Sequence, residues 1–174
     1  MRLQTMFKLA ASGTLALAIM VLPGSIMAQQ SQDTVLKAAD AQKMLPPAVY
    51  YAGQSATTQL RNSGGVKFAD GLYVLATMVD TSGYSTDVAT KYQAYFITEA
   101  PLKVGGQKLP AGIYGVGFVG DNKFVVTDVG AHDLLTVSFS LDKDIKRPTP
   151  LQVLANPGGG FRLYEGRKYV IFSR

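Results

Sequence analysis

The sequence contains no cysteine and only one histidine, His132, among its 174 residues. An exported form of this chain therefore has no disulfide and must be held together by its hydrophobic core alone. The lack of cysteine also excludes a lipoprotein anchored through a thiol, and one histidine cannot build a histidine-rich zinc site. Asn-x-Ser/Thr sequons are absent as well. These absences together favour a bacterial periplasm or exterior over a eukaryotic secretory route.

The N-terminus also lacks acidic residues, and its pattern is typical of a cleavable signal peptide. Arg2 and Lys8 precede or flank an apolar stretch from Leu9 to Leu22, and Ala28 is a small residue at the expected cleavage point. The alternative is an uncleaved membrane anchor, but this stretch is shorter than the roughly 20 apolar residues that a spanning helix needs. The sequence therefore predicts a signal peptide over 1–28, export, and a mature chain without a transmembrane segment.

The mature chain has little net charge. Cleavage after residue 28 removes Arg2 and Lys8, so fifteen basic and twelve acidic residues remain and the formal net charge falls from +5 to +3. A charge of this size gives no strong attraction to nucleic acid or to an anionic membrane. The chain that remains is long enough for one domain that buries about two-thirds of its unfolded surface.

Helical patterns are scarce after the signal peptide. Residues 29–48 are predicted as a leader with one short helix over 34–45, ended by Pro46 and Pro47, and an irregular leader is the alternative. Residues 49–174 are predicted as a single β-domain, because β-branched and aromatic segments alternate there with Gly, Asp and Asn about every ten residues.

About nine strands are expected in this domain. Their predicted ranges are 66–69, 72–79, 92–98, 113–119, 124–129, 134–139, 151–154, 161–164 and 168–172. The dipeptides Asp70-Gly71 and Gly105-Gly106 are typical of tight hairpin turns. Because no crossover helix separates the strands, the sequence predicts an all-β fold, an antiparallel sandwich or a small barrel.

Three glycines, Gly115, Gly117 and Gly120, match the spacing of a dinucleotide-binding loop. That loop requires a following helix, whereas the sequence predicts a strand over 124–129, so the match is interpreted as structural. Gly115 and Gly117 lie on the same face of their strand and, because glycine has no side chain, leave a shallow depression on that face. We expect something bulky on this face, either aromatic residues of the facing sheet or the N-terminal helix, and a ligand is the alternative.

A ligand on this face would define a small site. The candidate ligand-facing residues are Gly115, Gly117, Tyr95 and Phe118. They support a second hypothesis for the function, a carrier that holds a small apolar ligand inside the sandwich or barrel.

Catalytic and metal-binding motifs are incomplete. His132 lies in a predicted turn, and no serine has the glycine spacing of a nucleophile elbow, so a small hydrolase is the least favoured hypothesis. Ser140 and Lys143 have the Ser-x-x-Lys spacing of penicillin-recognising enzymes but lack the Lys-Thr-Gly strand that such enzymes need. The Asp and Asn turns at 121–122 and 142–144 lack the closing glutamate of a calcium loop. No catalytic residue, metal or cofactor is predicted.

One segment resembles a known hairpin. Residues 105–114, Gly-Gly-Gln-Lys-Leu-Pro-Ala-Gly-Ile-Tyr, are similar to a GGxxLPAGxY hairpin in exported bacterial β-proteins of unknown function, and the likeness extends over about 102–126. The resemblance implies export and a sandwich-like domain, and it carries over no catalytic or binding residue. We therefore expect an exported, non-catalytic β-domain with a structural or partner-binding role in the cell envelope, its partner being another envelope protein or a small apolar ligand.

Overall fold

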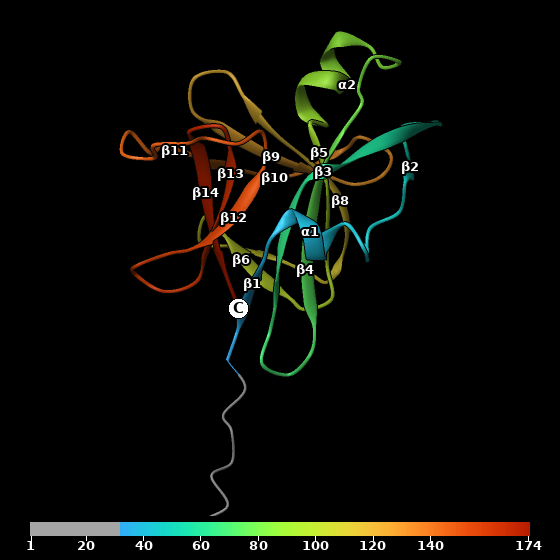
Figure 1. Cartoon of the computed structure of the whole chain (residues 1–174). Helices are drawn as coiled ribbons and strands as arrows, with labels where there is room; N and C mark the ends of the chain where they lie inside the picture. Colours follow the sequence, from blue (N-terminus) through green and yellow to red (C-terminus); the bar gives the residue numbers. More distant parts are fainter. Residues whose placement is uncertain (1–31) are drawn as a thin grey trace, which may run out of the picture.

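The computed structural model describes residues 32–174 (Figure 1). The predicted signal peptide, 1–28, lies outside the described residues. Within residues 32–174 no helix has the length and the apolar character needed to cross a membrane.

The chain folds into two antiparallel sheets that pack face to face. The larger sheet has the order β1-β3-β4-β5-β8-β9-β10 with β2 paired to β3, and the smaller has the order β12-β13-β14-β6-β7 with β11 paired to β14. The bounds are β1 Thr34–Leu36, β2 Ala48–Tyr51, β3 Gln54–Lys67, β4 Tyr73–Val79, β5 Ala94–Thr98, β6 Leu102–Val104, β7 Gln107–Leu109, β8 Gly112–Val119, β9 Lys123–Thr127, β10 Asp133–Ser138, β11 Ser140–Leu141, β12 Gln152–Ala155, β13 Phe161–Glu165 and β14 Lys168–Ser173.

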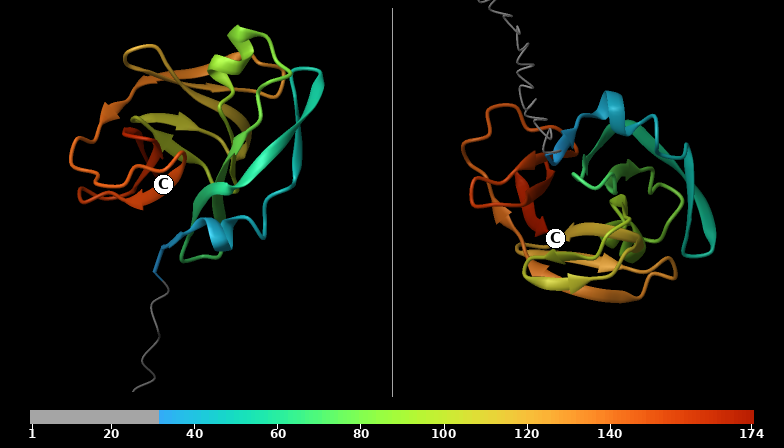
Figure 2. Two further views of the ribbon diagram at one scale, coloured as in Figure 1. Left: turned by 45° about the horizontal axis from the view of Figure 1, so that its top comes forward. Right: turned by 90° about the horizontal axis from the view of Figure 1, so that it is seen from below.

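The all-β prediction is confirmed, and the architecture is a sandwich rather than a closed barrel. The strands curve around a common centre, but their hydrogen bonds form two separate sheets (Figure 2). Residues 32–174 form fourteen strands instead of about nine. The prediction was too low because β6, β7 and β11 are only two or three residues long, because β1 lies in the segment predicted as a helix, and because β2 has only four residues directly after Pro46 and Pro47.

A short N-terminal helix is present as predicted, but it is much shorter than the predicted range 34–45. Residues Thr34–Leu36 pair with β3 as strand β1, and only one helical turn, α1 (Ala38–Ala41), follows. A second short helix, α2 (Thr86–Lys91), was not predicted and precedes β5. Its sequence carried a weak signal, since Asp87 in the first turn and Lys91 in the last turn complement the helix dipole.

Glycine turns shape the hairpins as expected, with one difference. Gly105 and Gly106 have φ angles of +53° and +87° and join β6 to β7 directly. The Asp70-Gly71 turn is wider than a two-residue hairpin, because the backbone N–H of Phe68 donates to the carbonyl of Leu72 and β3 already ends at Lys67.

Two apolar clusters stabilise the fold. The larger fills the space between the two sheets and includes Phe96, Phe118, Phe124 and Phe172. The smaller lies on the outer face of the larger sheet, under an N-terminal arm that we define as α1, β2 and the first residues of β3.

A bulge in β3 allows the arm to fold over this face. The pairing of β3 with β4 shifts register between Gln59 and Ser63, and the Ser63 hydroxyl donates to the carbonyl of Leu60 inside the bulge. Beyond it, Gly64 lies so close to β12 that a Cβ atom would be 3.1 Å from the backbone nitrogen of Val153. The same strand thus supports the arm and brings the two sheets together at one seam.

Candidate functional site

The low glycine face of β8 is covered by tyrosines of the chain itself. A Cβ atom at Gly115 would lie 2.6 Å from Cδ2 of Tyr92 and 2.7 Å from Cε2 of Tyr51. The two tyrosine rings stack with their centroids 3.6 Å apart, and each side chain is 1% exposed. At Gly117 a Cβ atom would be 2.6 Å from the carbonyl oxygen of Lys91. The bulky cover therefore comes from β2 and the end of α2, and not from the facing sheet or from α1.

The four predicted ligand-facing residues do not form one site. Tyr95 pairs with Gly115 across β5 and β8, so Tyr95, Gly115 and Gly117 face outward from the larger sheet. Phe118 points to the opposite side, where its ring lies 4.8 Å from that of Phe124 and belongs to the core between the sheets. Side chains alternate along a strand, and this alone separates Phe118 from the other three.

Two small voids lie in the sandwich interior formed by residues 32–174. One is lined by Phe96, Phe124 and Phe172 and the other by Met78, Phe118 and Leu163, and they measure about 10 Å³ each. A void of this size holds one water molecule at most. These two voids are too small to hold an apolar ligand between the sheets.

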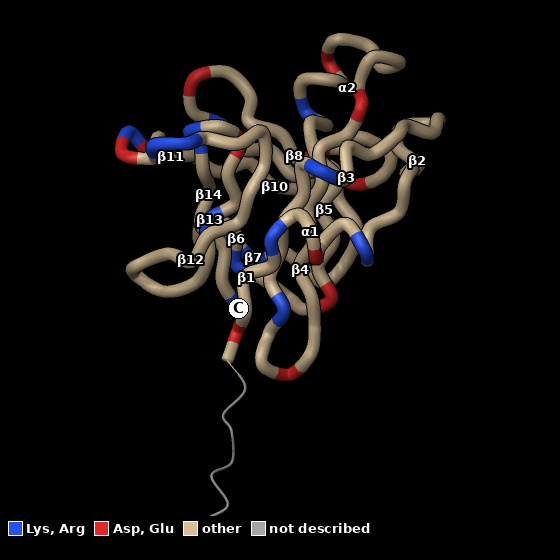
Figure 3. The backbone as a smooth tube through the Cα atoms, in the orientation of Figure 1, with Lys and Arg blue, Asp and Glu red and all other residues tan. Residues whose placement is uncertain are grey.

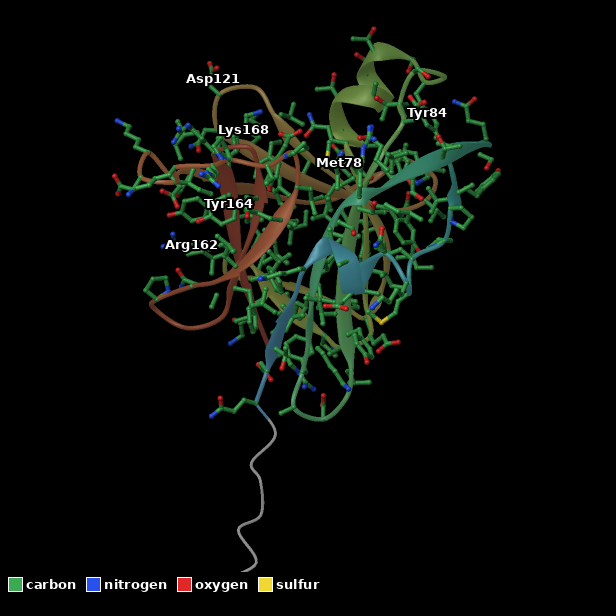
Figure 4. The ribbon with its side chains drawn as sticks, viewed as in Figure 1. Met78, Tyr84, Asp121, Arg162, Tyr164 and Lys168 are labelled. Atoms are coloured by element: carbon green, nitrogen blue, oxygen red, sulfur yellow. The ribbon has the colours of Figure 1, made fainter. Side chains whose placement is uncertain are left out.

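Hydrogen bonds tie the tyrosine cluster to the large sheet. The hydroxyl groups of Tyr51 and Thr127 are 2.5 Å apart, and the Tyr84 hydroxyl donates to the backbone carbonyl of Tyr51 at 3.1 Å (Figure 4 labels Tyr84). The Tyr92 hydroxyl is buried without a hydrogen-bond partner in the described part of the chain, and burial raises the pKa of this phenol strongly. A neutral, stacked cluster of this kind holds the arm against the sheet and offers no reactive group.

His132 caps a turn. Its Nδ1 lies 2.9 Å from Oδ2 of Asp128, and the backbone N–H groups of His132 and Gly130 both donate to Oδ1 of the same carboxylate. These backbone hydrogen bonds, with that of the imidazole, lower the pKa of Asp128. The imidazole is 79% exposed, and among residues 32–174 its only hydrogen-bond partner is Asp128. The histidine and the carboxylate therefore form a pair, but among residues 32–174 no nucleophilic side chain is hydrogen-bonded to the histidine.

A second polar cluster covers the outer face of the smaller sheet. The Tyr164 hydroxyl donates to Oδ2 of Asp142 at 2.8 Å, and the guanidinium of Arg162 lies over the ring of Tyr169 at 4.4 Å (Arg162 and Tyr164 are labelled in Figure 4). Oδ1 of Asp142 accepts the backbone N–H groups of Asp144 and Ile145. Because these groups satisfy one another, the cluster fastens the loop after β11 to the sheet. No group of three or more potential metal ligands is found within residues 32–174.

An open apolar groove lies at the end of the β6–β7 hairpin. It has a volume of about 500 Å³, is lined almost entirely by apolar atoms, and is called the hairpin groove below. Its lining residues are Pro101, Leu102, Lys103, Lys108, Leu109, Pro110 and Arg174. Leu102 and Leu109 are a cross-strand pair, 3% and 2% exposed, and both belong to the core between the sheets. The groove is therefore built on a fixed part of the fold.

Three cationic side chains surround the hairpin groove. Lys103 and Lys108 lie directly opposite each other on β6 and β7, and both are exposed. Arg174 follows β14, which pairs with β6, and its guanidinium is 2.7 Å from Oδ2 of Asp70 and 4.8 Å from the centre of the Phe68 ring. Neither lysine forms an ion pair with a carboxylate of residues 32–174. In Figure 3 acidic and basic residues are spread over both sheets, with basic segments at β11 and beside β7.

A smaller groove lies beside the N-terminal arm. It measures about 260 Å³ and is lined in part by Met44, Tyr73, Tyr95 and Glu99. The Glu99 carboxylate accepts the backbone N–H of Tyr73 at 2.8 Å, so its role in the strand pairing is evident. Of the predicted ligand-facing residues, Tyr95 is the one that lines a groove of this size.

The comparisons with known proteins found no match. No family model matches the chain, and no curated protein or solved structure is similar to it. The resemblance of residues 102–126 to a hairpin of exported β-proteins thus remains a prediction.

The sequence interpretation missed the hairpin groove, although a signal was present. Residues 101–110 read Pro-Leu-Lys-Val-Gly-Gly-Gln-Lys-Leu-Pro, which is nearly the same in both directions. A two-residue hairpin centred on such a palindrome places like residues opposite each other, and the structure has Leu102 opposite Leu109 and Lys103 opposite Lys108. The palindrome could have predicted a paired apolar face and a paired cationic face.

Proposed function

We propose that this protein is an exported, non-catalytic β-sandwich of the bacterial cell envelope that binds a partner molecule in the hairpin groove. The observation that carries the proposal is the pairing of Lys103 with Lys108 beside an open apolar groove, without an acidic partner in residues 32–174. Like charges directly opposite each other in a sheet are destabilising. A surface arranged in this way gains stability when a complementary molecule occupies it.

The dimensions of the groove support binding. A volume of about 500 Å³ is within the range of roughly 300–1,000 Å³ that is common for ligand sites. Such sites are largely pre-formed, with apolar walls and a few polar groups that orient the ligand. The hairpin groove has both features, since its leucines are anchored in the core and its charges stand at the rim.

The polar clusters elsewhere support a role without catalysis. His132 and Asp128 stabilise a turn, and Asp142 with Tyr164 fastens a loop. Each of these carboxylates has most of its hydrogen-bonding capacity occupied by backbone N–H groups or by neighbouring side chains. The composition is compatible with export, because a chain without cysteine forms no unwanted disulfides in the oxidising conditions outside the cytoplasm.

Native mass spectrometry tests the proposal on protein expressed with its own N-terminus and purified gently from the periplasm. The expected spectrum shows a mature chain that starts near Gln29 and carries a non-covalently bound molecule. Pro101→Glu, which places a charge on the groove wall, should abolish the adduct. Pro148→Glu, at an exposed proline outside the groove, should retain it.

Three results would overturn parts of this proposal. A mass that includes residues 1–28 would contradict export with cleavage. A bare mature chain would contradict a retained partner molecule. An adduct retained equally by Pro101→Glu and Pro148→Glu would contradict the assignment to the hairpin groove.

A further inference from the structure

We infer that the hairpin groove binds a single-chain amphiphile whose alkyl chain enters the groove and whose phosphate-type anionic head group lies between Lys103 and Lys108. This inference rests on the proposed binding function and names the ligand class for the same site. It follows from three features of the groove: its apolar floor, the lack of free backbone donors at its ends, and the placement of its charges.

The floor of the groove suits an alkyl chain. The exposed Pro101 and Pro110 supply apolar surface to the groove, and the buried Leu102 and Leu109 lie beneath it at the ends of the two strands. Proline has no backbone N–H, so neither flanking residue presents a donor to the groove. The carbonyl of Pro110 already accepts the hydroxyl of Tyr114 at 3.0 Å. A polar ligand would find few partners along this floor, whereas an alkyl chain needs none.

The rim of the groove suits one anionic group. Side chains directly opposite each other in an antiparallel pair have their Cβ atoms about 4.5–5.5 Å apart, so the two lysine side chains can converge on one head group. Lysine binds phosphate as a point charge and can reach it from a flexible stem. Arg174 is already paired with Asp70, so it adds apolar surface and a partly compensated charge. The uncompensated charge of the site is that of Lys103 and Lys108.

The alkyl chain and the head group of the ligand would bind to different parts of the hairpin. In β6 and β7 the leucines point into the sandwich and the lysines point out of it, because neighbouring residues of a strand face opposite sides. Apolar and cationic groups meet where the groove is lined by the exposed Pro101 and Pro110 together with both lysines. An amphiphile matches this arrangement, while inorganic phosphate would leave the apolar floor exposed to water.

Isothermal titration calorimetry on the mature protein tests the inference with n-hexyl, n-octyl and n-decyl phosphate below their micelle concentrations. We expect binding that tightens about fourfold for each methylene that enters the groove. Inorganic phosphate and octyltrimethylammonium should bind at least tenfold more weakly than octyl phosphate.

A matched pair of double variants isolates the head-group contact. Lys103→Gln with Lys108→Gln should weaken octyl phosphate binding at least tenfold and leave octyl glucoside binding unchanged. Lys143→Gln with Lys146→Gln makes the same change of net charge on the exposed loop after β11 and should leave octyl phosphate binding unchanged. Circular dichroism confirms that all variants are folded.

The alternative results are distinct. Equal binding of octyl glucoside and octyl phosphate would overturn the anionic head group and leave the proposed groove function standing. Equal binding of inorganic phosphate and decyl phosphate would overturn the alkyl chain and indicate a free phosphate. Binding only to phosphatidylglycerol vesicles would overturn the single-chain ligand in favour of a membrane surface. No calorimetric signal with any probe, together with a bare chain in native mass spectrometry, would overturn both proposals.

Discussion

The glycine face of β8 and the hairpin groove are two apolar surfaces of the same sandwich with opposite outcomes. The glycine face is closed by stacked Tyr51 and Tyr92, which occupy the space that the missing side chains of Gly115 and Gly117 leave. The hairpin groove stays open, and charged side chains surround it. A low strand face therefore does not by itself indicate a ligand, because the chain can fill it with its own aromatic rings.

One surface is closed and the other open because different parts of the chain lie next to them. The glycine face lies beneath the N-terminal arm, which the β3 bulge folds over it. The groove lies at the ends of β6 and β7, where prolines stop the strands. Burial there would require a further element of the chain or a partner. Variants of both regions test whether the closed face and the open groove differ in this way.

The largest expected effect is on the closed face. Gly115→Val should destabilise the fold by about 1–3 kcal/mol, because its side chain would overlap Tyr51, Tyr92 and Thr127. The measurement is urea unfolding followed by tyrosine fluorescence. Gly83→Ala is the control, since its Cβ atom would lie no closer than 3.8 Å to any neighbour. Equal stability of Gly115→Val and the wild type would show that the tyrosine cover is easily displaced.

A smaller effect should distinguish two tyrosines of the same stack. Tyr51→Phe removes the hydroxyl contact with Thr127 and should cost about 1 kcal/mol of unfolding free energy. Tyr92→Phe removes a hydroxyl that is buried without a partner in the described residues and should be neutral or stabilising. Denaturant unfolding of both variants gives the comparison. A larger loss for Tyr92→Phe than for Tyr51→Phe would contradict it.

The turn between β13 and β14 offers a pH-dependent test. Burial raises the pKa of Glu165, and the nearby ammonium of Lys168, 3.4 Å away, only partly opposes this shift (Lys168 is labelled in Figure 4). A carboxyl group with a raised pKa in the folded state contributes stability below its unfolded pKa of about 4.3, and loses it as the pH rises through the folded pKa.

Glu165→Gln should therefore lose less stability than the wild type between pH 4 and pH 7. Thermal unfolding across this range measures the difference. Asp121→Asn, at an exposed turn, is the matched control and should follow the wild-type profile. Parallel profiles for Glu165→Gln and the wild type would contradict the effect of burial.

The smallest effect is expected at the open groove. Lys108→Gln removes the like charge opposite Lys103 and should stabilise the unliganded protein by about 0.2–1 kcal/mol at low salt. The gain should shrink at high salt, because salt screens the repulsion between exposed charges. Lys143→Gln on the exposed loop after β11 is the control, with no gain expected. A loss of stability in Lys108→Gln would show that the lysine pair is not repulsive.

The sequence predicted the fold class because the relevant signals are local. Runs of β-branched and aromatic residues in 113–119 and 124–129, separated by a glycine turn, form β8 and β9 as expected. Gly105-Gly106 forms its hairpin for the same reason, since only glycine adopts both positive φ angles easily. The candidate site was predicted less well, since three of its four residues lie on a filled or half-covered face and Phe118 lies in the core.

The remaining errors concern features that depend on distant contacts. The segment 34–36 has a weak helical pattern, but its pairing with β3 makes it a strand. Tertiary pairing outweighs a local preference of a few tenths of a kcal/mol per residue. The helix α2 is too short to have a periodic signal, and contacts with β8 and β9 hold it in place.

The strand-rich character and the turns follow from residues that are neighbours in the chain, and the lack of disulfides follows from the composition. The sequence also contains the palindrome that pairs Lys103 with Lys108 once a two-residue turn forms. Which surfaces are closed depends on the folded structure. Whether Gly115 faces a ligand or Tyr51 depends on contacts across more than 60 residues of chain, and no local pattern encodes such contacts.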